Sequence, residues 1–158
     1  MALVGQNFPD IEVEAINEMG DKFNINVFKK AKDEKKKILL FWYPKDFTFI
    51  CPTELHSFQK NLNEFVKRNT IVIGASCDSA EVHFAWLNTP KDNGGIEGVS
   101  YDLIADTNRN LSSTLNILDG EIPNSDNPNY IKGDNVSYRA TYLIDEGGKI
   151  FHEGVNHM

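Results

Sequence analysis

An α/β fold, with a central mixed sheet flanked by helices and an N-terminal β-hairpin extension, is predicted for this chain of 158 residues. The apolar runs Ile38–Tyr43 and Thr70–Ser76 have the length and composition of buried strands. Between them, apolar residues recur at the spacing of a helix. Strand, helix and strand in this order form a right-handed βαβ unit with parallel strands.

The chain before the first buried strand contains the hairpin signal. Val13–Ile16 and Phe23–Ile25 flank a turn that contains Gly20, and Asn26 can cap a short helix that follows. The lysine-rich stretch 29–37 could form a nucleic-acid patch. In an acidic chain, a solvated turn before a buried strand is the better interpretation.

The helix between the two buried strands is predicted to begin near Cys51. Pro52 suits the first helical position, where no amide hydrogen is needed, and Glu54 suits the first turn. The predicted apolar face of this helix consists of Leu55, Phe58, Leu62, Phe65 and Val66.

After the second strand, Ser79 is expected to cap a helix from Ala80 to about Leu87. We expect His83 on this helix to lie at the surface or in an interface, and Cys77 to be a small buried apolar residue. The Gly- and Asn-rich segment 88–98 is predicted to be a loop.

The remaining chain is predicted to contain a short strand at Tyr101–Ala105, a helix to about Leu115 and a loop at 119–134. Val136–Ile144 and Lys149–His152 then form a second hairpin around a Gly-Gly turn. Arg139 interrupts the first of these strands, so its charge has to be paired or exposed.

Composition limits the function classes. A net charge of −7 argues against a nucleic-acid partner, and no apolar run is long enough to span a membrane. Two cysteines do not make a secreted disulfide framework, and the four histidines have no zinc-ligand spacing. The N-terminus lacks the pattern of a signal peptide, so we expect a cytoplasmic protein with one domain over residues 1–158.

Cys51 is the candidate nucleophile, because it lies where a strand gives way to a helix start. Free N–H groups and the positive end of the helix dipole favour a thiolate there, and peroxides oxidise thiolates to sulfenic acid. Thr48 could place a hydroxyl beside the sulfur, and Pro44 would stiffen the loop. The alternative is that Cys51 is a buried structural cysteine.

Pro44, Thr48 and Cys51 form the pattern Pro-x-x-x-Thr-x-x-Cys, and Phe47–Glu54 reads Phe-Thr-Phe-Ile-Cys-Pro-Thr-Glu. This segment resembles the peroxidatic motif of typical two-cysteine peroxiredoxins, the alkyl hydroperoxide reductase and thioredoxin peroxidase family. The segment Ala85–Pro90 is similar to the same family. The resemblance implies a thioredoxin-like fold and a thiol peroxidase that reduces hydrogen peroxide and organic hydroperoxides through a sulfenic acid at Cys51.

The resemblance also implies the remaining site residues. Arg139, followed by Ala140 and an apolar strand, matches the arginine that stabilises the thiolate and the peroxide oxygens, and Glu54 matches the active-site glutamate. The family needs no bound cofactor, because the sulfur is itself the redox centre. Thioredoxin or a flavin-dependent disulfide reductase is the implied reductant. A homodimer, able to assemble into a ring of five dimers, is the implied oligomer.

Family members continue beyond the position of Met158, with a C-terminal helix and a tail that carries the resolving cysteine. The 158 residues contain neither, so we expect them to carry out only the first half of the reaction and to leave apolar sheet surface uncovered. That surface suggests an alternative function, a redox-controlled chaperone (holdase) or interaction protein.

Overall fold

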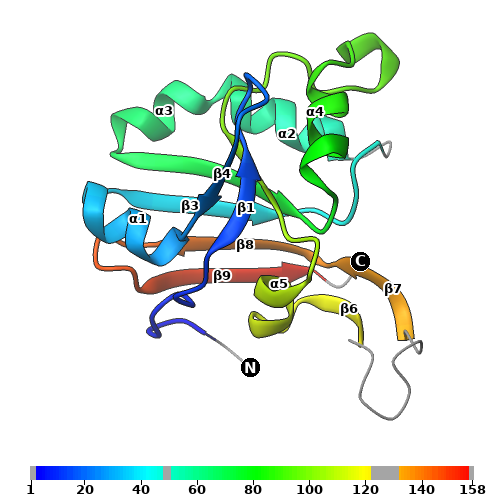
Figure 1. Cartoon of the computed structure of the whole chain (residues 1–158). Coiled ribbons are helices and arrows are strands. Elements are labelled where there is room, and N and C mark those ends of the chain that lie inside the picture. The colour runs from blue at the N-terminus through cyan, green and yellow to red at the C-terminus, as the bar shows by residue number, and fades with distance from the viewer. Residues whose placement is uncertain (1–2, 48–50, 122–131, 157–158) are drawn as a thin grey trace.

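The structure is a computed structural model that describes residues 3–47, 51–121 and 132–156. Its centre is a mixed seven-stranded sheet (Figure 1). In spatial order the strands are β2 (Lys22–Ile25), β1 (Val13–Ile16), β5 (Asp102–Ala105), β4 (Thr70–Ser76), β3 (Lys37–Trp42), β8 (Arg139–Ile144) and β9 (Ile150–Asn156). The predicted parallel pairing of β3 with β4 and the two predicted antiparallel hairpins, β1–β2 and β8–β9, are confirmed.

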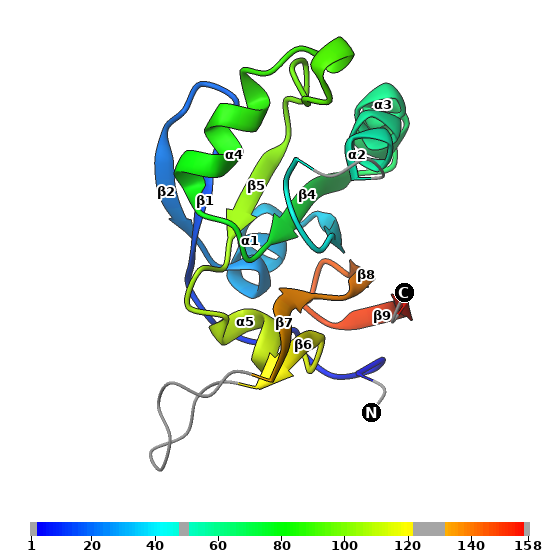
Figure 2. The same ribbon diagram turned by 90° about the vertical axis from the view of Figure 1, so that its right-hand side faces the viewer.

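Helices cover both faces of this sheet (Figure 2). The helices are α1 (Val27–Glu34), α2 (Cys51–Lys60), α3 (Leu62–Lys67), α4 (Ala80–Leu87) and α5 (Asn110–Thr114), with a 3-10 turn η1 (Lys91–Asn93). Residues of α1 and α5 join one apolar cluster with the sheet, and residues of α2, α3 and α4 join the other. The predicted α/β class, a mixed sheet flanked by helices, is confirmed.

Strand β3 shows why its sequence is apolar without interruption. Ile38, Leu40 and Trp42 belong to the cluster on the α1 and α5 side. Leu39 and Phe41 belong to the cluster on the α2 and α4 side. Side chains alternate between the two faces of a strand, so a strand covered on both faces needs an apolar residue at every position.

The helix that follows Cys51 is broken in two, whereas one continuous apolar face was predicted. Asn61 separates α2 from α3, and both its backbone N–H and its side-chain amide donate to the Ser57 carbonyl oxygen. An asparagine side chain that binds the backbone in this way competes with helical continuation. Leu62 and Phe65 pack against the cluster on this side of the sheet, whereas Val66 is 63% exposed and does not belong to the apolar face.

Part of the predicted loop 119–134 is also regular. β6 (Leu118–Glu121) pairs antiparallel with β7 (Lys132–Ser137) in a separate two-stranded sheet. The predicted strand Val136–Ile144 is correspondingly divided at Tyr138, whose N–H donates to the Ile117 carbonyl oxygen at 2.7 Å. The pairing depends on contacts between distant segments, which the local sequence pattern does not encode.

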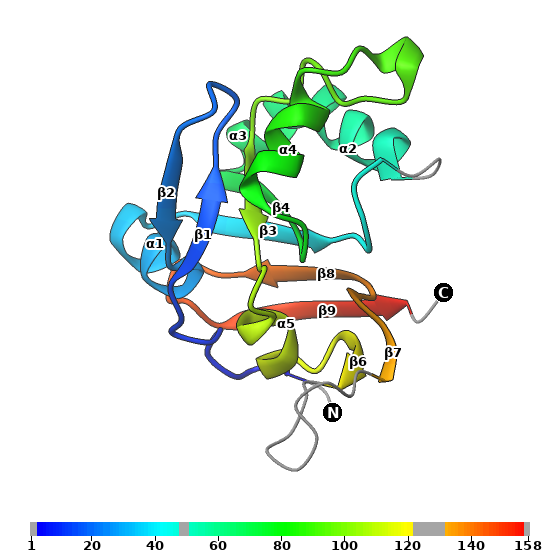
Figure 3. The same cartoon turned by 45° about the vertical axis from the view of Figure 1, so that its right-hand side comes forward.

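β8 and β9 continue the sheet beyond β3, and β9 is its outer strand (Figure 3). The N-terminal segment reaches the start of β9, where the Gly5 N–H donates to the Ile150 carbonyl oxygen at 2.8 Å. None of the described helices is both long and apolar enough to cross a membrane.

Candidate functional site

Helix α2 begins with Cys51 and is fixed to the sheet by its buried face. Leu55 is fully buried, and its carbonyl oxygen accepts a hydrogen bond from the Tyr101 hydroxyl at 2.7 Å. The Phe58 ring stacks on Phe41 of β3 with centroids 4.3 Å apart. The middle of α2 is therefore held against the sheet, and the free N–H groups of its first turn favour negative charge at that end. The side chain of Cys51 lies outside the described part of the chain.

Glu54 and Arg139 form an ion pair between α2 and the first residue of β8. The predicted need for a partner to Arg139 is met by Glu54, one helical turn after Cys51. Burial raises the pKa of Glu54, although the charge of Arg139 acts in the opposite direction. The pair lines a cavity of about 450 Å³, which also touches Trp42, Thr141 and Val155.

Pro44 follows a firmly held end of β3. The Tyr43 N–H donates to the Ala75 carbonyl oxygen at 3.0 Å, and the Tyr43 carbonyl oxygen accepts from the Ser137 hydroxyl at 3.0 Å. Pro44 is half-buried. Thr48, the other predicted member of the motif, lies outside the described residues.

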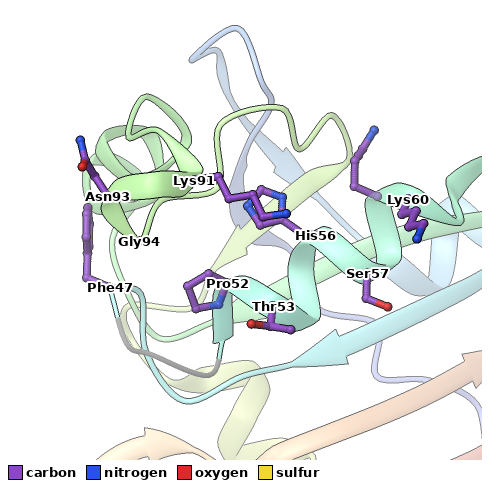
Figure 4. Close-up of a pocket in the computed structure, with 10 residues that line it drawn as sticks. Phe47, Pro52, Thr53, His56, Ser57, Lys60, Lys91, Asn93 and Gly94 are labelled. Carbon is purple, nitrogen blue, oxygen red and sulfur yellow. The ribbon is translucent and has the colours of Figure 1, made fainter.

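A second cavity, of about 790 Å³, lies on the outer side of α2 (Figure 4). Pro52 and Thr53 of the first helical turn line it, together with Lys91 and Gly94 from the loop opposite. His56 connects the two walls, because its Nε2 lies 3.0 Å from the Gly95 carbonyl oxygen. The loop 88–98 is thus attached directly to the helix that carries Cys51.

His83 is fully buried, so the prediction of a surface or interface histidine is wrong. Its Nδ1 lies 2.6 Å from Asp46 Oδ2, and its Nε2 lies 2.9 Å from the Ile104 carbonyl oxygen. The spacing of the sequence contained the signal, since Ala80, His83 and Trp86 share one helical face and all three are buried. The prediction gave more weight to the polar character of histidine than to its position on the buried face of the helix. A polar side chain can be buried when it has hydrogen-bond partners.

Cys77 is buried at the end of β4, as predicted, with its Sγ 3.6 Å from the Ser112 hydroxyl. Burial raises the pKa of its thiol to about 11. Arg109 follows β5 and donates to the Thr107 carbonyl oxygen at 2.6 Å. No group of three metal-ligating side chains is found in the described ranges.

Comparison with known proteins gives consistent matches. Residues 4–153 match the AhpC/TSA family. Over the whole chain, 37% of residues are identical to an alkyl hydroperoxide reductase C of Buchnera aphidicola, of which the chain spans 73%. A chloroplastic 2-Cys peroxiredoxin of Spinacia oleracea is 35% identical, and the chain spans 54% of it, about half its length.

A solved structure shares the architecture. The reduced 2-Cys peroxiredoxin of Plasmodium vivax superimposes with a TM-score of 0.82 at 34% identity, over 98% of this chain and 86% of the other. The predicted thioredoxin-like architecture is confirmed by this likeness.

Proposed function

The chain belongs to the AhpC/TSA family, and from that premise we propose that it is a thiol-dependent peroxidase that acts on hydrogen peroxide and organic hydroperoxides. In the proposed reaction the Cys51 thiolate attacks the distal peroxide oxygen. A sulfur–oxygen bond forms as the oxygen–oxygen bond breaks, and the leaving oxygen takes up a proton as water or alcohol. Cys51 becomes a sulfenic acid, and the peroxide is reduced by two electrons.

The observation that best supports this proposal is the ion pair of Arg139 with Glu54, one turn after Cys51. A fixed guanidinium beside the helix start stabilises a thiolate by charge. Its N–H groups can also donate to the peroxide oxygens as negative charge develops on the leaving one. Glu54 orients Arg139, while Thr48 and Pro44 are proposed to shape the pocket around the sulfur.

The proposal also includes the reductant, the oligomer and the location of the protein. A resolving cysteine on a neighbouring subunit would form a disulfide with Cys51, and thioredoxin or a flavin-dependent disulfide reductase would reduce it. The proposed unit is one domain over residues 1–158 that forms homodimers, with a ring of five dimers as the larger assembly. We also propose that the protein acts in the cytoplasm.

The reaction of reduced protein with hydrogen peroxide tests the proposal. It is followed by tryptophan fluorescence, with mass spectrometry of Cys51 at the end. Arg139→Ala is expected to lower the rate constant about 100-fold, the typical loss for one donor to a developing anion. The control is Arg68→Ala, which removes an exposed arginine paired with Glu64 on α3 and should keep the rate. Wild-type reaction no faster than that of a free thiol would contradict the proposal.

A further inference from the structure

A buried ionisable pair with no role in the proposed reaction lies between α4 and residues 43–47. Asp46 and His83 have fully buried side chains, and 2.6 Å separates Asp46 Oδ2 from His83 Nδ1. Two such groups are costly to bury, and they persist only where hydrogen bonds compensate for the lost water. The pair joins α4 to the 43–47 segment, which follows β3.

Asp46 is held from two sides. Its side chain contacts His83, and its backbone N–H donates to Asp78 Oδ2 at 2.8 Å. The same oxygen of Asp78 accepts from the Ser76 hydroxyl at 2.8 Å, which fixes it to the end of β4. Asp46 is thus fixed to both α4 and the end of β4, five positions before Cys51.

The residue after Asp46 needs this anchor. Phe47 has a φ of +59°, in the left-handed region that side chains other than glycine rarely occupy. Phe47 is 52% exposed, and its ring lies against Trp86 with the ring centroids 5.9 Å apart. A strained backbone of this kind persists only where its surroundings determine it. The hydrogen bonds of Asp46 to His83 and Asp78 fix the backbone at the residue directly before Phe47.

The hydrogen-bond partners fix where the protons lie. The Ile104 carbonyl oxygen can only accept, so His83 Nε2, at 2.9 Å, carries a hydrogen. The short contact on the other side needs a second proton between Nδ1 and the carboxyl oxygen of Asp46. Without it, a lone pair of the imidazole would face a carboxylate in a buried site.

We propose that His83 is a positioning residue for Cys51 that acts through Asp46, and that the proton shared by the two side chains fixes the 43–47 segment. The inference rests on the proposed peroxidase function and adds a residue from α4 to its machinery. His83 touches no reacting atom in this scheme. It sets the backbone from which the chain runs to Cys51.

The surroundings favour retention of the shared proton. Burial raises the pKa of Asp46 despite the opposing hydrogen bond from His83. Burial by itself would lower the pKa of His83, but the hydrogen bond and charge of Asp46 outweigh it, and this pKa is raised. Two other titratable groups face the pair: Asp78, whose charge raises both pKa values, and the Tyr43 hydroxyl, 3.4 Å from Nδ1. β5 contributes the Ile104 carbonyl.

The direction of the pH effect follows. An unfolded histidine loses its proton near pH ~6.5, whereas folded His83, with its raised pKa, keeps it to higher pH. The stabilising contribution is therefore complete below about pH 6.5 and is lost as the pH rises through the folded pKa. Loss of the shared proton should release the 43–47 segment and slow the oxidation of Cys51.

Two variants separate positioning from simple packing. Asp46→Asn keeps a hydrogen bond, because its amide can donate to Nδ1 of neutral His83, but it removes the titrating proton. His83→Phe fills the space and removes both hydrogen bonds. The rate constant of Cys51 oxidation by hydrogen peroxide is measured for each protein from about pH 6 to 10, and circular dichroism and thermal melting verify folding. Imidazole ¹⁵N NMR follows His83, and amide NMR follows the 43–47 segment.

For the wild type we expect the rate constant of Cys51 oxidation to fall about tenfold on the alkaline side, which corresponds to the loss of one hydrogen bond to a charged group. Over the same pH range, His83 should lose its proton and the NMR signals of the 43–47 amides should shift. Asp46→Asn should lack this alkaline loss, and His83→Phe should be about tenfold slower throughout while still folded. The proposal is overturned if His83 titrates near pH ~6.5 as a free imidazole does. It is also overturned if Asp46→Asn retains the wild-type profile, or if folded His83→Phe reacts at the wild-type rate.

The readouts also separate the two proposals. If wild-type Cys51 reacts no faster than a free thiol, the peroxidase proposal fails, and the positioning role falls with it whatever His83 does. If wild-type Cys51 reacts fast but the signals of the 43–47 amides do not change as His83 titrates, the peroxidase proposal is kept and only the positioning role is lost.

Discussion

The Cys77 thiol shows how local surroundings decide whether a cysteine reacts. Its Sγ is buried against the Ser112 hydroxyl. Burial is the largest cause of its raised pKa, and the negative charges of Asp106 and Asp78 act in the same direction. Only the thiolate is nucleophilic. Cys77 is thus an inert thiol, whereas the helix start proposed to activate Cys51 favours the opposite protonation state.

This contrast predicts selective labelling. With its pKa at about 11, roughly one Cys77 in a thousand is a thiolate at about pH 8. Iodoacetamide at that pH should alkylate Cys51 and leave Cys77 unmodified, as read by peptide mass spectrometry. Cys77→Ala should therefore keep the wild-type labelling stoichiometry of one per chain. Comparable modification of both cysteines in the folded protein would show that burial does not control the reactivity of the Cys77 thiol.

His83 shows which features of the site could be predicted from single residues of the sequence and which could not. The motif residues Pro44, Thr48 and Cys51, and Arg139 and Glu54 as single site residues, were predicted from sequence, because short local patterns contain them, but the pairing of Arg139 with Glu54 was not predicted. The partnership of His83 with Asp46 was not predicted either, because the two residues are 37 positions apart and meet only through the sheet topology. Spacing along α4 could identify the buried face, but it could not identify the partner.

At the scale of elements, prediction succeeded where a local signal fixes the structure. The Ser79 hydroxyl accepts from the Val82 N–H at 3.2 Å and begins α4, as its sequence position indicated. The break at Asn61 and the β6–β7 pairing were missed. The first depends on one side chain competing for a backbone carbonyl, and the second on a pairing between separate segments.

The loop 88–98 depends on the absence of a side chain at one glycine. A Cβ on Gly95 would lie 1.9 Å from the Thr89 carbonyl oxygen, so even alanine forces the backbone apart. The loop is otherwise tied to α4 and α2, since Gly94 accepts from Trp86 Nε1 at 2.9 Å and His56 contacts the Gly95 carbonyl oxygen. A displaced Gly95 would disturb both attachments.

Gly95→Ala should therefore destabilise the protein by about 2–4 kcal/mol, the range of a backbone clash at a buried attachment. The matched control is Gly147→Ala, where the nearest atom to the new Cβ is Asp145 Oδ1 at 3.4 Å and the change should stay within about 0.5 kcal/mol. Urea unfolding followed by tryptophan fluorescence measures both. Equal midpoints for the two variants would contradict the close approach at Gly95.

At the scale of the whole molecule, the sheet joins the parts of the site. β3 leads to Pro44 and Asp46, β8 begins with Arg139, and α2 carries Cys51 and Glu54. β3 pairs with β8, so Trp42 lies opposite Ala140, and the end of the first strand meets the start of the second. The βαβ unit was predicted from its apolar pattern. The antiparallel neighbour β8 was predicted as part of a hairpin, and no local pattern placed it beside β3.

The distribution of cysteines over the molecule gives the last prediction. Within the 158 residues the only thiols are Cys51 and Cys77, and Cys77 is buried with a raised pKa. A buried thiol of this kind is a poor nucleophile toward a sulfenic acid. The 158-residue chain by itself should therefore consume one equivalent of hydrogen peroxide per Cys51 and then stop, even with thioredoxin and its reductase present.

An added small thiol should restore turnover, because it can attack the sulfenic sulfur, release water and form a mixed disulfide that a second thiol reduces. Peroxide consumption measured against protein concentration checks the stoichiometry, and Cys77→Ala is the control that should behave identically. Many turnovers by the 158-residue chain with thioredoxin and its reductase, lost in Cys77→Ala, would instead identify Cys77 as a resolving thiol. That result would require the end of β4 to open far enough to expose a side chain that is 6% exposed in the folded protein.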